Sequence, residues 1–179
     1  LELNVFVDAF GVPADKVGKN VCFHLLIGFD PDQNPQYWTD HLLRNCRTEE
    51  RTFGGTLVRG IADGIDKVAQ ILAPSGAYII PAHLHSGSDA FRTRSVDNIY
   101  SDSEFLRWAK YHFTALDVRK DSTAQFFDGQ HAETGHLERT CIRSSDAHAA
   151  ADLGAHPTWV QMEQVSFNEL KAALELPGR

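Results

Sequence analysis

Two short motifs in this 179-residue chain pair a histidine with a second metal-binding side chain. Asp146 and His148 stand in S-S-D-A-H, and His83 and His85 stand in P-A-H-L-H-S. Each motif directly follows a predicted strand, where residues two apart point to the same side. Carboxylate and imidazole groups suit Zn²⁺, Mn²⁺ or Fe²⁺. We therefore expect a metal site, although an Asx turn with a solvated histidine explains D-A-H alone, and surface histidines explain H-L-H alone.

Two more polar side chains interrupt apolar strand patterns. His24 lies inside V-C-F-H-L-L-I-G-F, and Glu2 stands between two leucines. A buried imidazole needs a hydrogen-bond partner or a metal, because an unsatisfied polar group is costly in a protein core. Two simpler explanations stay open at this point: His24 as a satisfied core histidine, and Glu2 as a carboxylate at a water-exposed edge.

A further set of side chains is assigned to substrate contact. Asp117 ends a predicted strand, and the guanidinium group of Arg143 is of the kind that binds phosphate. His131 lies in a long polar loop predicted over residues 120–138, and His85 follows the third strand. Surface charge is the more common role of an arginine such as Arg143, a solvated loop is the simpler explanation for His131, and His85 is explained as well by a surface position.

Hydrophobic periodicity predicts the elements that position these residues. Strands are expected at residues 3–7, 21–29, 77–82, 113–118, 140–145 and 158–162, and helices at residues 36–46, 61–72, 102–112 and after Ser166. The last helix carries an S-x-x-E capping box formed by Ser166 and Glu169. Strands that alternate with helices indicate an α/β fold with mostly parallel strands, whose chemistry collects at the carboxyl ends of the strands.

Composition restricts the class of protein. A hydrophobic content of 42% fits one globular domain, and no apolar run approaches the ~18 to 20 residues that span a bilayer. The formal net charge of −7 disfavours a salt-driven nucleic-acid binder, although metal ions can supply positive charge locally. Three widely spaced cysteines without a C-x-x-C pair indicate a reducing, cytoplasmic setting.

The order of these motifs resembles a known family. Glu in L-E-L, His in F-H-L-L, A-H after a G-A-Y-I-I strand, and S-S-D-A-H with a later L-G resemble the PHP (polymerase and histidinol phosphatase) metallophosphoesterase domain. The tail with T-W-V-Q-M, S-F-N-E-L-K-A-A-L and P-G-R is similar to PHP domains fused to AAA or SMC-like ATPases, including the TrlF-type family. The resemblance is thin over residues 47–60 and 120–138.

The resemblance implies a distorted (β/α)7 barrel with Mn, Zn or Fe ions at the carboxyl ends of its strands. The implied ligands are Glu2, His24, His83, Asp146 and His148, with Glu2 bridging two ions, and His83, Asp146 and His148 as catalytic residues. The implied reaction is hydrolysis of a phosphoester by a metal-bound hydroxide. Implied partners are a nucleic acid or nucleotide substrate, an AAA or SMC-like ATPase domain and, as an option, further copies of the chain, but no membrane.

One departure from the family pattern changes the expectation for activity. PHP domains begin with an H-x-H motif on their first strand, and nothing precedes Leu1 here. We expect residues 1–179 to be a single PHP-type domain that lacks its first strand or strands and, alone, hydrolyses phosphoesters poorly. The alternatives are a catalytically degenerate interaction or regulatory domain attached to an ATPase, and a zinc amidohydrolase. The amidohydrolase would need a carboxylated lysine, for which the chain offers no suitable position.

Overall fold

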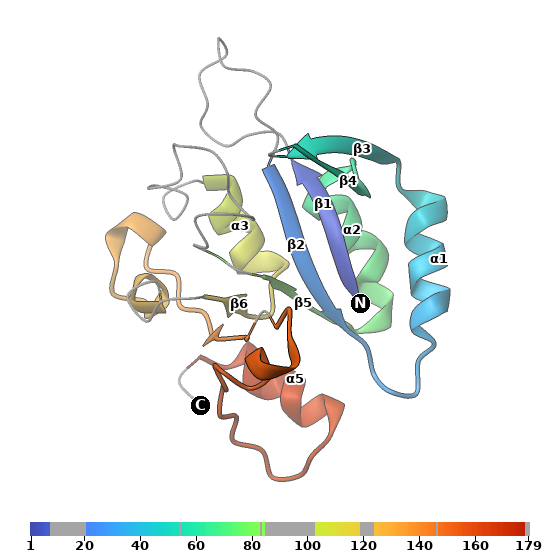
Figure 1. Ribbon diagram of the computed structural model, residues 1–179. Helices are drawn as coiled ribbons and strands as arrows, with labels where there is room; N and C mark the ends of the chain where they lie inside the picture. The colour runs from blue at the N-terminus through green and yellow to red at the C-terminus, as the bar shows by residue number, and fades with distance from the viewer. Residues whose placement is uncertain are drawn as a thin grey trace.

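A five-stranded mixed sheet forms the centre of the structure, a computed structural model that describes residues 1–7, 21–53, 55–82, 84, 103–118, 124–145 and 147–177. The strand order is β3-β4-β1-β2-β5. The strands are β1 (Glu2–Val7), β2 (Val21–Gly28), β3 (Thr48–Phe53), β4 (Thr56–Ile61) and β5 (Tyr78–Pro81). β2 runs antiparallel to both β1 and β5, whereas β4 runs parallel to β1 (Figure 1).

A second, parallel pair of strands lies beside β5. It consists of β6 (Leu116–Asp117) and β7 (Cys141–Ile142). Leu84, just beyond β5, forms a parallel bridge with Val118, and its amide donates to the carbonyl of Asp117 at 2.9 Å. The carboxyl ends of β5, β6 and β7 therefore meet at one edge, where α/β folds carry their chemistry.

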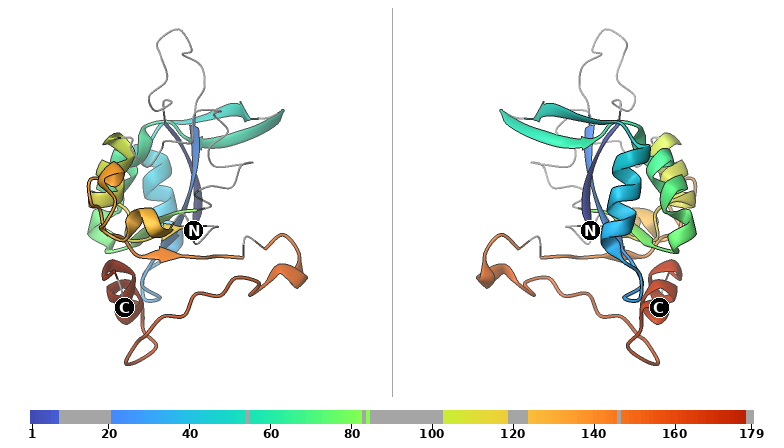
Figure 2. Two further views of the ribbon diagram at one scale, coloured as in Figure 1. Left: turned by 90° about the vertical axis from the view of Figure 1, so that its left-hand side faces the viewer. Right: turned by 90° about the vertical axis from the view of Figure 1, so that its right-hand side faces the viewer.

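Three helices cover one face of the sheet (Figure 2). They are α1 (Pro35–Asn45), α2 (Gly64–Leu72) and α3 (Ser103–Tyr111). The spacing of Ile65, Val68 and Leu72 places them on one side of α2, where all three are buried in the main core. Odd-numbered strand residues such as Val5 and Leu25 fill the sheet side of the same core.

The last described helix, α5 (Phe167–Glu175), packs near β5 and β6 rather than on the main core. Leu174 joins Ile80 and Ala115 in a smaller buried cluster. The helix begins as expected, because the side chain of Ser166 accepts a hydrogen bond from the amide of Glu169 at 3.2 Å. Short 3₁₀ helices complete the described chain: η2 (Ala73–Ser75), η4 (Gln125–Phe127), η5 (Ala132–Thr134) and η6 (Ala150–Asp152). No helix of the described residues is long and apolar enough to cross a membrane.

The predicted (β/α)7 barrel is wrong. A barrel of that kind needs parallel strands throughout, but β2 runs antiparallel between β1 and β5, and β3 and β4 form an antiparallel hairpin. The described strands form a mixed five-stranded sheet and a separate two-stranded pair, with no closed barrel among them.

Several local expectations also need correction. The β3–β4 hairpin was not expected, and the helix predicted from Ile61 begins at Gly64 because Ile61 ends β4. Residues 158–162 form no strand. The described part of the predicted polar loop at 120–138 holds η4 and η5, and Phe127 is buried in the main core.

Candidate functional site

Glu2 and His24 lie together on the face of the sheet opposite α2. In the β1–β2 register Glu2 stands opposite Leu26 and His24 stands opposite Asn4, so that all four side chains share one face. Oε1 of Glu2 lies 3.5 Å from Nδ1 of His24. The Glu2 side chain is 62% exposed and that of His24 is 26% exposed, so this carboxylate–imidazole pair is accessible to solvent and ions.

The same face carries two more polar side chains that sequence reasoning missed. Asn4 donates from Nδ2 to the carbonyl of Arg59 at 3.1 Å, and Sγ of Cys22 lies 3.9 Å from Oδ1 of Asn4. We call Glu2, Asn4, Cys22 and His24 the polar strip. Strict alternation along residues 2–6 and 22–26 was the signal that would have found Asn4 and Cys22, because it places every even-numbered residue on one face.

The cysteine of the polar strip is chemically quiet. Burial raises the pKa of the Cys22 thiol to about 11, against a smaller lowering by the charge of Arg51. Burial likewise raises the pKa of Cys141 to about 12, and all three cysteines are free thiols. The two thiols are therefore protonated at neutral pH, and neither is suited to act as a nucleophilic thiolate.

A backbone hydrogen bond connects the polar strip with the end of β5. The amide of Ala82 donates to the carbonyl of His24 at 2.8 Å, which fixes the carboxyl end of β5 beside His24. Ala82 is the residue before His83 in the sequence. His83 itself, like His85 and Asp146, lies outside the described residues.

Asp117 lies at the edge where β5, β6 and β7 end. Its side chain is 1% exposed and accepts two hydrogen bonds from Ser144, from the backbone amide at 3.0 Å and from the hydroxyl at 2.7 Å. Ser144 is the first residue of S-S-D-A-H. Asp117 therefore anchors the beginning of that motif, and its predicted contact with substrate stays a prediction.

His148 is exposed in the segment that follows β7. Its backbone amide lies 3.3 Å from Oδ2 of Asp152, and the amide of Ala149 donates to the same oxygen at 3.0 Å. These contacts shape the turn into η6 and leave the imidazole at the surface. The expected strand over residues 140–145 is shorter, since β7 ends at Ile142, so His148 lies six residues past the strand and its role as a ligand stays a prediction.

Arg143 and His131 are held by structural contacts. The amide and carbonyl of Arg143 both bond to the hydroxyl of Thr158, at 2.8 and 2.9 Å, and its Nη2 lies 3.3 Å from Nδ1 of His156. His131 packs its ring 5.0 Å from that of Phe126, in the segment of η4 and η5. Neither residue contacts the polar strip in the interactions described.

Two of the predicted metal ligands, Glu2 and His24, lie close together among the described residues. Within the described residues, no group of three or more His, Cys, Asp and Glu side chains is arranged to hold an ion. Glu2 and His24 do provide a carboxylate and an imidazole on one accessible face, a donor set that suits Zn²⁺ or Mn²⁺. They fit as part of a metal site, and convergence of the full five-residue set stays a prediction.

Comparison with known proteins adds no relative: no protein-family model, no curated protein and no solved structure matches this chain. The resemblance to PHP domains therefore rests on the motifs of the sequence.

Proposed function

We propose that this protein is a metal-dependent phosphoesterase, a phosphatase or a nuclease, and that Glu2 and His24 form part of its metal site. The proposal rests on one observation above the others: an acid and an imidazole, 22 positions apart in sequence, approach to 3.5 Å on an exposed sheet face. Both residues were singled out by their resemblance to PHP ligands, and both interrupt otherwise apolar strands.

Glu2 controls the orientation of His24 in this proposal. A proton on Nδ1, which lies 3.5 Å from Oε1 of Glu2, would leave Nε2 as the ring nitrogen that can bind an ion. Metal-binding histidines commonly have one ring nitrogen held by a carboxylate in this way. The second oxygen of Glu2 keeps acceptor capacity for an ion, so one residue can both orient the imidazole and bind.

The S-S-D-A-H segment supplies the other half of the proposed site. Asp117 holds Ser144 by two hydrogen bonds, which fixes where the chain leaves β7 on its way to Asp146 and His148. His83, Asp146 and His148 remain the proposed further ligands. When bound, divalent ions stabilise charge on the phosphoryl oxygens and acidify water for attack.

A nuclease or phosphatase of this composition depends on its ions for substrate attraction. The net charge of −7 repels a phosphodiester backbone, and Glu2 adds negative charge at the polar strip itself. Bound cations would reverse the local sign. Chelation should therefore weaken both substrate binding and turnover.

The test is phosphate or nitrophenol release by the natural protein that carries this chain. Substrates are p-nitrophenyl phosphate, bis(p-nitrophenyl) phosphate and single-stranded DNA, each with Mn²⁺, with Zn²⁺ and with EDTA. We expect release that requires a metal and falls at least tenfold in Glu2→Gln and in His24→Ala. Matched controls are Glu50→Gln, an exposed strand glutamate in β3, and His41→Ala on α1. Release that resists EDTA, or that survives His24→Ala in full, would refute the proposal.

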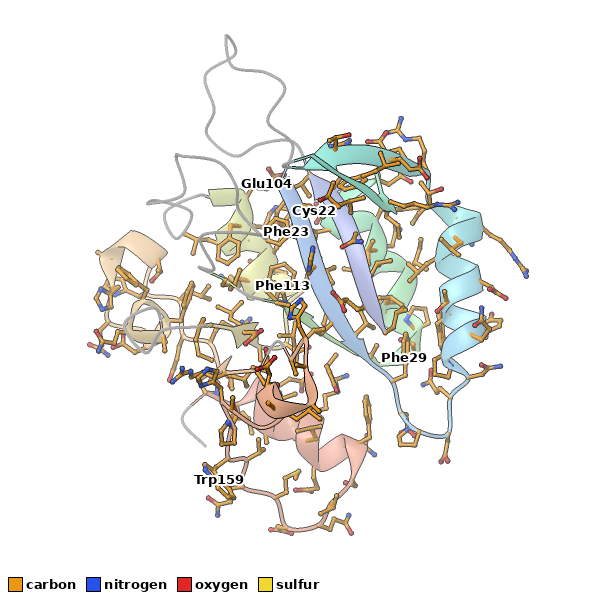
Figure 3. The ribbon with its side chains drawn as sticks, in the orientation of Figure 1. Cys22, Phe23, Phe29, Glu104, Phe113 and Trp159 are labelled. Atoms are coloured by element: carbon orange, nitrogen blue, oxygen red, sulfur yellow. The ribbon has the colours of Figure 1, made fainter. Side chains whose placement is uncertain are left out.

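A second candidate function, a regulatory module that binds a partner domain, is favoured by a different observation. The segment between β7 and α5 exposes three large apolar side chains: Leu153 at 72%, Trp159 at 91% and Val165 at 96%. Figure 3 places Trp159 on the outer side of that segment. Exposed apolar side chains that gather into one patch are typical of contact surfaces. If no substrate is hydrolysed with any metal, while Trp159→Ala impairs the natural protein's ATPase, the regulatory function is the correct one.

A further inference from the structure

A second concave site lies at the opposite end of β5, β6 and β7 from Asp117. It is a pocket of about 420 Å³ whose wall includes the residues just before β5 and β6, the end of α3, and part of α5. Gly76 and Ala77 precede β5, and Phe113 and Thr114 precede β6. The pocket therefore lies at the amino ends of these strands, away from Asp117 and Ser144.

Positively charged side chains predominate among the charged residues that line this pocket, although the protein as a whole is negatively charged. Lys110, Arg139 and Lys171 line it, and Glu175 is its one acidic lining residue. The chain as a whole carries a formal charge of −7. Clustering of cations in a concave site focuses a positive potential there, which attracts anions that the rest of the surface repels.

Arg139 is the deepest of the three cations. Its guanidinium donates to the carbonyls of Ala109 at 2.5 Å, of Glu138 at 3.3 Å and of Lys110. No carboxylate of the described residues pairs with it, and burial lowers the pKa of the group. Three of its five N–H donors are used by these carbonyls, so two remain for a ligand.

Lys110, Lys171 and Thr114 also line the pocket and offer further hydrogen-bond donors to a ligand. The Lys110 ammonium has no hydrogen-bond partner among the described residues and lies 5.2 Å from the ring centre of Tyr111. Lys171 donates to the carbonyl of Gly76 at 2.7 Å and lies 3.7 Å from Glu175, which leaves part of its donor capacity. The Thr114 hydroxyl accepts from the amide of Ile79 at 3.1 Å, so its own proton is available to donate.

We propose that this pocket binds a small molecule through a phosphate group. Phosphate offers several strong acceptor oxygens and up to two negative charges, and it matches a set of one guanidinium, two ammonium groups and a hydroxyl. The volume exceeds that of the phosphate itself, and the exposed side chain of Tyr111 among the lining residues can contact the rest of the ligand. Binding needs no divalent ion, because the protein supplies the positive charge.

The experiment is calorimetric titration of inorganic pyrophosphate into the full chain, in EDTA and at constant ionic strength. We expect saturable binding to one site that weakens at least tenfold in Lys110→Glu. Lys171→Gln should weaken pyrophosphate binding less, because the Lys171 ammonium already donates to the carbonyl of Gly76 and lies beside the carboxylate of Glu175. The matched control is Lys67→Ala on α2, outside the pocket, which should bind as the unchanged chain does. Circular dichroism of each variant confirms that the fold is intact.

Three results would overturn the proposal: no saturable heat with pyrophosphate, equal affinity in Lys110→Glu, or equal loss in the Lys67→Ala control. Citrate is titrated in parallel as a carboxylate probe. We expect it to bind more weakly than pyrophosphate, and tighter citrate binding would contradict the assignment to phosphate. Because EDTA is present throughout, these outcomes do not depend on the proposed metal site.

Discussion

The carboxylate of Asp117 accepts both hydrogen-bond donors of Ser144, the backbone amide at 3.0 Å and the hydroxyl at 2.7 Å. Asp117 is buried at the end of β6, and Ser144 lies two residues past β7. This contact fixes the point at which the S-S-D-A-H segment leaves the sheet. Two residues that are 27 positions apart thus fix the start of the segment that carries the predicted ligands Asp146 and His148.

Ser144→Ala removes the hydroxyl that donates to Oδ2 of Asp117, an oxygen of a buried carboxylate. We expect the free energy of unfolding to fall by about 1 to 2 kcal/mol, the usual cost of such a loss. Urea unfolding followed by circular dichroism measures it. Ser145→Ala is the control, because Ser145 forms no hydrogen bond in the described structure, and it should stay within about 0.5 kcal/mol. Equal stability of Ser144→Ala and the unchanged chain would show that the contact does not hold the segment.

Asp66 joins α2 to α3 and should make stability depend on pH. Its carboxylate accepts from both Nη atoms of Arg107 at 2.6 Å and from Nε1 of Trp108 at 3.1 Å, and it lies 2.7 Å from Nε2 of His112. The hydrogen bonds from Arg107, followed by those from Trp108 and His112, hold the pKa of Asp66 well below its ordinary value of 3.8. The contribution to stability is therefore complete above about pH 4 and is lost as the pH falls through the lowered pKa.

Asp66→Asn should lower the free energy of unfolding by about 1 kcal/mol at pH 7, a value that allows for screening because the side chain is half exposed. The difference from the unchanged chain should persist down to pH 5 and shrink below pH 4. Chemical denaturation at pH 7, 5 and 3 follows it. Asp40→Asn, which removes an exposed carboxylate 3.9 Å from Arg44, should have little effect. A difference that grows on acidification would contradict the assigned direction.

Gly60 permits the close approach of β4 to β1. A Cβ at this position would lie 2.8 Å from the backbone oxygen of Asn4 and 3.0 Å from Cζ of Phe6. Since the backbone cannot yield as a flexible side chain does, Gly60→Ala should cost about 1 to 3 kcal/mol. Thermal unfolding compares it with Leu57→Ala, an exposed position in the same strand that should matter little. A neutral Gly60→Ala would mean that β4 and β1 are not packed as described.

Local elements were predictable where one physical signal dominated. The apolar run at residues 21–29 became β2, the stripe of Ile65, Val68 and Leu72 became α2, and the Ser166 capping box starts α5. The β3–β4 hairpin was missed because β3 reads T-E-E-R-T-F, a polar segment at the edge of the sheet. Gly54-Gly55 between the two strands was an available turn signal, and Gly55 indeed has a φ of +88°.

Local sequence patterns could not show that the chain forms a mixed sheet in place of the predicted barrel. Alternation of strands and helices predicts parallel strands, but the position of β2 between β1 and β5 depends on pairing across the sheet. The same pairing sets the register that places Glu2 near His24. Sequence reasoning identified both residues as candidates through the family resemblance, and only the sheet register gives their distance.

The most direct test of the proposed metal site is calorimetric titration of Zn²⁺ and Mn²⁺ into the unchanged chain and into His24→Ala, with His41→Ala as the matched control. His41 stacks on Tyr37 on α1 and should not contribute to metal binding. We expect His24→Ala to weaken the affinity for the ion at least tenfold, because it removes a ligand. Glu2→Gln should weaken the affinity as well, because Glu2 both orients the imidazole and binds the ion. His41→Ala should leave the affinity unchanged. Equal metal affinity in the unchanged chain and in His24→Ala would contradict the proposed metal site.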